Sequence, residues 1–174
     1  NARRMPSTWR CWIEAAAELQ GLPPDLGPTL RDEVDYWLGT TFFRMRRNYG
    51  GAAQLLLAVA KRLKGDRQAD AMFHGARALS RADRDDEAIV GYRDMLSVHP
   101  HSKYSAEASF LIGWLDYNRS RYQQAITSLD ETLKRRTDTV PGRYDIARLH
   151  PAEHPGNRAQ VLDASRRTAL GRTR

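Results

Sequence analysis

Apolar residues recur every three to four positions along most of the chain, the spacing that places them on one face of an α-helix. The first such helix is predicted over 7–20, where one face carries Trp9, Trp12, Ile13 and Ala16. Gly21 and the following Pro-Pro pair end it, because proline cannot continue a helix. We therefore expect an N-terminal helix and a proline-rich linker over 1–31.

Three later segments share a second pattern, in which a small residue lies inside a first helix and an alanine opens a second one. The small residues are Gly39, Ala76 and Gly113. The units span 32–65, 69–102 and 106–134, and their opening alanines are Ala52, Ala88 and Ala125. These alanines are 36 and 37 residues apart (88 − 52 and 125 − 88). Stacked helix pairs of this length bury a shared apolar face, so the pattern predicts an all-α solenoid of about three helix-turn-helix repeats.

Local signals mark the expected ends of these helices. Gly65 is typical of a helix C-terminus. Asp83 with Asp86, and Ser120 with Gln123, match capping boxes at the starts of the second helices of units two and three.

The pattern changes after Arg136, where proline and glycine interrupt every window long enough for a helix pair. Only 157–170 could be helical, and its apolar face is thin. We expect 135–174 to be a weakly structured tail, because it buries too little apolar surface to offset the entropic cost of ordering the chain. A natural tail and a truncated or altered end would both account for this change.

Most of the formal charge of +7 lies in that tail, which holds nine arginines and four acidic residues, leaving 19 basic and 17 acidic residues before it. A basic tail is more often a solvated segment than a phosphate-binding groove, so the charge argues against nucleic acid as a partner. No apolar run approaches the roughly 20 residues of a membrane span. The compartment cannot be read from an N-terminus that begins at Asn1.

Candidate chemistry is sparse. His99 with His101, and His150 with His154, flank prolines in expected turns, without a cysteine or carboxylate at ligand spacing, so no metal site is expected. Phosphate loops, dinucleotide-binding glycine motifs and nucleophile elbows do not occur. Cys11 lies beside a tryptophan on an apolar helix face. Because it is the single cysteine, it cannot form an internal disulfide. We expect neither a cofactor nor catalysis.

The first helices of the repeats should line the concave wall of a solenoid. The candidate groove residues are aromatic or basic, namely Phe73, Arg77, Arg81, Phe110, Trp114 and Tyr117. Aromatic anchors beside arginines would suit an extended peptide that carries a carboxylate. As alternatives, the two phenylalanines pack between neighbouring helices and the two arginines pair with acidic residues of the next repeat.

Over 32–134 the chain resembles the tetratricopeptide repeat superfamily. Three stretches carry this resemblance: Tyr36-Trp37-Leu38-Gly39, Ala76 to Leu79, and Ala108 through Tyr122. Tyr-Trp-Leu-Gly with the later His-Pro-x-Ser-x-Tyr-x-x-x-Ala of 99–108 is most similar to the non-catalytic helical superhelix of bacterial soluble lytic murein transglycosylases. It also resembles repeats of outer-membrane assembly and cell-envelope coordination proteins. The resemblance to the transglycosylase superhelix implies a periplasmic or cell-envelope location and a role in positioning peptidoglycan.

Two functions follow as expectations. One is a non-catalytic scaffold that binds a protein or peptide in a concave groove. The other is the accessory helical domain of a periplasmic lytic transglycosylase. The catalytic Glu-Ser pair of that family occurs nowhere in the chain, so the resemblance covers a non-catalytic part.

Overall fold

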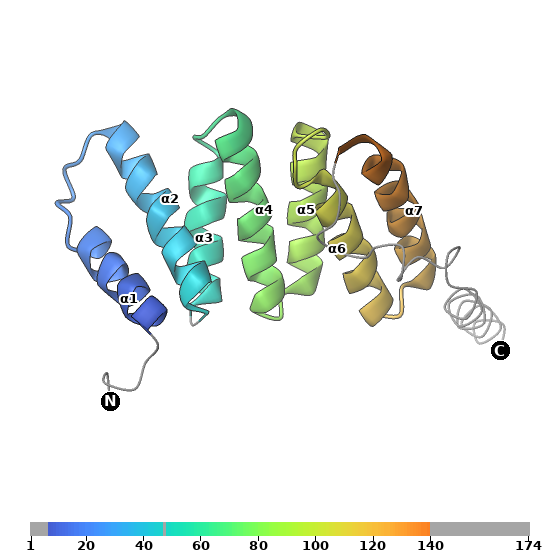
Figure 1. The fold of residues 1–174 in the computed structure, drawn as a ribbon, viewed down its shortest axis with the longest axis horizontal. Coiled ribbons are helices and arrows are strands. Elements are labelled where there is room, and N and C mark those ends of the chain that lie inside the picture. Colours follow the sequence, from blue (N-terminus) through green and yellow to red (C-terminus); the bar gives the residue numbers. More distant parts are fainter. Residues whose placement is uncertain (1–6, 47, 140–174) are drawn as a thin grey trace. The chain divides into compact units, whose positions relative to one another are not determined.

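The computed structural model describes residues 7–46 and 48–139, and of these the side chains of 10–46 and 48–133. This part of the chain is all-α, as predicted (Figure 1). Its helices are α1 (Ser7–Gln20), α2 (Pro28–Met45), α3 (Tyr49–Ala60), α4 (Gly65–Arg81), α5 (Asp85–Val98), α6 (Ser105–Asn118) and α7 (Tyr122–Thr139). They fall into two compact units, α1–α5 up to His99 and α6–α7 from Pro100 onward.

In the first unit each helix packs against the next one in the chain, and successive helices run in alternating directions (Figure 1). α2 also contacts α4, although α3 lies between them in the sequence. A core cluster of Tyr36, Leu56, Val59, Ala60 and Ala71 joins these three helices. Helices α2 and α4 therefore present neighbouring faces, and this neighbourhood positions the candidate site described below.

The helix pairs α2–α3, α4–α5 and α6–α7 repeat the same local geometry. The three marker alanines are each the fourth residue of the second helix, and each is almost completely buried. Each donates its N–H to the carbonyl four residues earlier, Ala52 to Asn48 at 2.9 Å, Ala88 to Arg84 at 3.0 Å and Ala125 to Arg121 at 3.0 Å. Almost complete burial at these positions leaves little room for a larger side chain, which explains why alanine recurs.

The turns that end α4 and α6 are also alike, and they correct the predicted capping boxes. Asp83 and Ser120 have φ values of 60° and 59°, in the left-handed region. The next N–H in each turn donates back to the first helix, Arg84 to Leu79 O at 3.0 Å and Arg121 to Asp116 O at 2.8 Å. This bond pattern is the Schellman motif, so both residues end a helix instead of capping the next one.

Other helix boundaries differ from the predicted ones by a few residues. Gly65, with φ of +60°, opens α4, whereas α3 has already ended at Ala60. α7 continues to Thr139, past the Lys134 at which the third unit was expected to end. The remainder of the predicted tail, 140–174 with its candidate helix 157–170, lies outside the described residues. None of the helices between Ser7 and Thr139 has the length and apolar character needed to span a bilayer.

Candidate functional site

A stripe of polar side chains follows α4 toward α2. Its members are separated by three and four residues in turn, so they share one helix face. They are Arg67, Asp70, His74, Arg77 and Arg81. Glu33, Tyr36 and Trp37 of α2 meet the start of this stripe. We call these eight residues the α2–α4 face.

Arg67 organises the aromatic end of this face. Its guanidinium carbon lies 4.4 Å from the centre of the Tyr36 ring and 5.5 Å from that of Trp37. The same guanidinium donates to the Glu33 carboxylate. Trp37 is 47% exposed. The guanidinium held by a carboxylate therefore lies over two rings, of which Trp37 is accessible to solvent and Tyr36 is buried.

Tyr36 of α2 forms a hydrogen bond to α4 next to the Arg67 and Trp37 side chains. Its hydroxyl donates to Asp70 Oδ2 at 2.5 Å, and its side chain is buried. Burial, followed by the hydrogen bond to Asp70, raises the pKa of Tyr36 to about 12. His74 Nδ1 lies 3.5 Å from the same Asp70 oxygen. The Tyr36 hydroxyl is therefore a neutral donor across the physiological range.

We expect Tyr36→Phe to lower the free energy of unfolding near pH 8 by about 1–2 kcal/mol, because the hydrogen bond that Tyr36 donates to Asp70 is lost. The folded pKa exceeds the unfolded value of about 10, so this contribution is present below pH 10 and is lost as the pH rises to 12. The difference between wild type and variant should shrink over that window. Urea denaturation at pH 8 and pH 11.5 measures it.

The exposed Tyr117 supplies the matched control, since Tyr117→Phe should change the unfolding free energy little at either pH. A Tyr36→Phe difference that stayed constant from pH 8 to 11.5 would contradict the coupling to Asp70.

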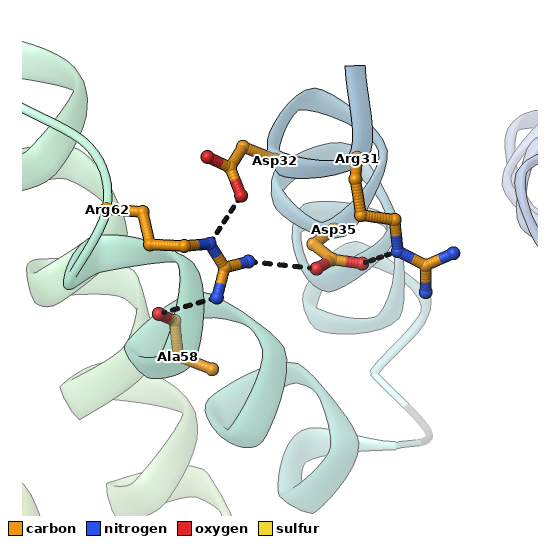
Figure 2. Close-up of polar contacts among 5 residues, drawn as sticks. All are labelled: Arg31, Asp32, Asp35, Ala58 and Arg62. Carbon is orange, nitrogen blue, oxygen red and sulfur yellow. Dashed lines mark hydrogen bonds and ion pairs between the residues drawn. The ribbon is translucent and has the colours of Figure 1, made fainter. Parts of the chain in front are cut away.

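A second polar cluster fixes the start of α2 against the end of α3 (Figure 2). Arg62 donates from Nε to Asp32, from Nη2 to Asp35 Oδ2 at 3.1 Å, and from Nη1 to the Ala58 carbonyl at 3.5 Å. Arg31 Nε lies 3.1 Å from the other Asp35 oxygen. The hydrogen bond to Asp32 is the main cause of a raised Arg62 pKa. Because Arg62 is half-exposed, this cluster orients α2 more than it stabilises the fold.

In the second unit, α6 carries an exposed aromatic patch. Trp114 and Tyr117 are 42% and 37% exposed, and their rings stack with centroids 6.3 Å apart and an interplanar angle of 22°. Tyr122 of α7 meets Tyr117 edge-on at 5.7 Å. Beside them, Arg121 Nε donates to the buried Asp116 at 2.7 Å and joins the turn to α6. Trp114 and Tyr117 are thus accessible on the surface of this unit.

Two of the predicted groove residues belong to the core instead. Phe73 is 1% exposed and its ring lies 5.7 Å from that of Tyr92, and Phe110 is buried against Leu129. Neither ring can meet a ligand, so the alternative of packing between helices is confirmed for both. The physical reason is that these inward positions face the second helix of their own pair.

The predicted arginines remain at the surface. Arg77 is half-buried, with its guanidinium carbon 5.9 Å from the Phe73 ring centre. Arg81 is exposed at the end of α4, and no carboxylate among the described residues forms an ion pair with it. Arg81 is therefore available to an anionic group of a ligand.

Sequence reasoning did not place Trp37 and Arg67 in the site. Tyr36-Trp37 was interpreted as a repeat marker, and Arg67 lies just before the predicted second unit. The three-four spacing from Arg67 to Arg81 is a signal that could have identified the stripe.

Other chemistry is sparse in the part of the chain that the structure describes. It holds no group of three or more histidine, cysteine or acidic side chains placed to bind a metal ion. His99, one of the histidines considered as a ligand, instead contacts Gln68 at 3.0 Å. In comparisons with known proteins, no protein-family model matches the chain, and no curated protein matches it.

Proposed function

We propose that the chain is a tetratricopeptide-like α-solenoid that acts as a non-catalytic scaffold for protein or peptide ligands. The recurrence of a buried alanine at the fourth position of α3, α5 and α7 supports the repeat. The direct contact of α2 with α4 supports a shared inner wall of first helices. A repeat of this kind supplies a surface, and the ligand is inferred from the side chains on it.

The half-exposed Trp37 under a fixed arginine is the observation that carries the proposal. Tryptophan and arginine are enriched among the residues that dominate binding energy at interfaces. Arg67 and Arg81 are 14 residues apart on α4, which corresponds to about 21 Å along the helix axis. An extended peptide of about six residues spans that distance. We propose that its apolar side chain packs on Trp37 and its carboxylate pairs with Arg81.

A library of seven-residue peptides with free C-termini, each compared with its amidated form by fluorescence anisotropy, tests this function. We expect selected binders to lose about tenfold or more in affinity with Trp37→Ala. A similar loss is expected with Arg81→Ala, because a charge-assisted hydrogen bond is removed. Amidation should weaken binding to the wild type and change little in the Arg81→Ala variant.

Arg10→Ala on α1 is the matched control, since Arg10 is also exposed but lies off the α2–α4 face. Equal affinities of the free and amidated peptides, or equal effects of Arg10→Ala and Arg81→Ala, would contradict the proposed site.

The stacked pair of Trp114 and Tyr117 favours a second candidate function, as the accessory helical domain of a periplasmic lytic transglycosylase that positions peptidoglycan. Flat exposed rings offer an apolar surface on which the faces of sugar rings can pack. Cosedimentation with purified peptidoglycan that is lost in Trp114→Ala and kept in Trp37→Ala would favour this function over the first.

A further inference from the structure

A groove of about 670 Å³ lies between α3 and α5, with α4 as its floor. Leu57 of α3 and Met72 and Leu79 of α4 make much of it apolar. Met72 is two residues from His74, which corresponds to a rotation of about 200° around α4. This α3–α5 groove therefore lies on the opposite side of α4 from the α2–α4 face and is a separate surface.

The wall formed by α5 alternates acidic and apolar side chains. Asp86, Val90, Asp94 and Val98 are spaced by four residues and all line the groove. Val90 is 55% exposed and Val98 is 54% exposed. Single exposed valines are common, but these two continue an apolar floor, and a continuous exposed apolar surface rimmed by polar groups is typical of an interaction site.

The rim of the groove is acidic. Asp86, Glu87 and Asp94 stand on α5 and face one cation, Lys61, on the α3 side. With Arg84, which pairs with Glu87, the formal charge of this group is −1 (2 − 3). Arg84 donates to both Glu87 oxygens at 2.7 and 2.6 Å from outside the groove, and this hydrogen bonding lowers the Glu87 pKa. The negative sign contrasts with the chain's net charge of +7 and disfavours nucleic acid or anionic lipid at this surface.

The dimensions of the groove fit a short helix. Asp86 and Val98 are 12 residues apart, about 18 Å along α5, which is the length of roughly three helical turns. An amphipathic helix can lay a ridge of apolar side chains into an apolar groove and extend charged side chains to its rim.

We propose that the α3–α5 groove binds a basic amphipathic helix of a partner protein. The apolar ridge of the partner packs on Met72, Leu79 and Val90. Its lysine or arginine side chains pair with Asp86 and Asp94, whose eight-residue separation matches basic positions about two turns apart on the incoming helix.

The experiment uses the full chain and two synthetic 16-residue probe helices with the same leucine ridge, one flanked by lysines and the other by glutamates. By fluorescence anisotropy the basic probe should bind at least tenfold more tightly than the acidic one. Its affinity should fall as salt rises. Asp86→Asn with Asp94→Asn should weaken the basic probe about 3- to 10-fold, because two rim ion pairs are lost.

Val90→Lys should weaken the basic probe further, by more than tenfold, because it removes an apolar contact and adds a like charge. Both substitutions lie at exposed positions of α5, so the fold should be retained, which far-UV circular dichroism checks. The double variant Glu14→Gln with Asp25→Asn makes the same charge change at exposed positions of the same unit that do not line the groove, and it should leave binding unchanged.

Equal binding of the two probes, or binding that none of the groove variants weakens, would overturn the proposal. So would a concentration-dependent dimer in sedimentation that Val90→Lys dissociates, because a second copy would then occupy the groove. Trp37→Ala should not alter basic-probe binding, so a failure here is distinguishable from a failure of the proposed peptide site on the α2–α4 face.

Discussion

Phe73→Ala is expected to lower the free energy of unfolding by about 3–5 kcal/mol, the range for truncating a buried phenylalanine. The ring is 1% exposed and contacts both His74 and Tyr92. Its removal leaves a cavity among α4 and α5 that the surrounding helices can fill only in part. Urea denaturation followed by far-UV circular dichroism measures the loss.

The control variants separate a core role from a binding role. Phe73→Leu keeps most of the apolar volume and should cost appreciably less than Phe73→Ala. Trp37→Ala truncates a larger but half-exposed ring and should also cost less. A Phe73→Ala variant with wild-type stability and reduced peptide binding would indicate that Phe73 contacts the ligand, and it would contradict the place of Phe73 in the core.

The all-α class and the buried alanines could be predicted because they depend on residues whose size matters locally. Ala52, Ala88 and Ala125 recur where two helices of one pair approach, and all three are buried as the pattern requires. The helix over 7–20 has the predicted bounds because Gly21 and the prolines after it stop the helix in any tertiary context.

The membership of the candidate site was harder to predict, because periodicity shows which residues share a helix face but not how neighbouring helices cover that face. Phe73 and Arg77 are four residues apart on α4, yet α5 buries the first and leaves the second half-exposed. Trp37 belongs to a repeat marker in the sequence, whereas the contact of α2 with α4 places it beside Arg67 at the surface. Burial of this kind depends on contacts between residues about 30 positions apart in the chain.

The capping boxes failed for a related reason. Asp83 and Ser120 have the residue types of helix N-caps, but the chain must reverse within the few residues between the two helices of a pair. A left-handed residue makes that reversal, and aspartate tolerates this conformation better than most residues do. The geometry of the turn therefore determined the role of these positions.

Gly113→Leu is expected to lower the free energy of unfolding by about 1–3 kcal/mol through overpacking between α6 and α7. A Cβ built at Gly113 would lie 2.8 Å from Leu129 Cγ and 3.2 Å from the Ala125 carbonyl oxygen. One of these neighbours belongs to the backbone and the other to the branch point of a buried side chain, so neither can yield without moving α7.

Gly50 in the first turn of α3 is the matched control, because a Cβ there would meet nothing within 4 Å. Gly50→Ala should leave the urea midpoint unchanged or raise the stability by up to about 1 kcal/mol, since alanine favours the helix over glycine. Gly113→Ala should instead lower the free energy of unfolding, because the close contact with Leu129 outweighs the same gain in helix propensity. If Gly113→Ala and Gly50→Ala stabilised the protein equally, α6 and α7 would not approach at Gly113. The register that aligns Gly113 with Gly39 and Ala76 would then be wrong, and with it the argument that the third helix pair repeats the first two.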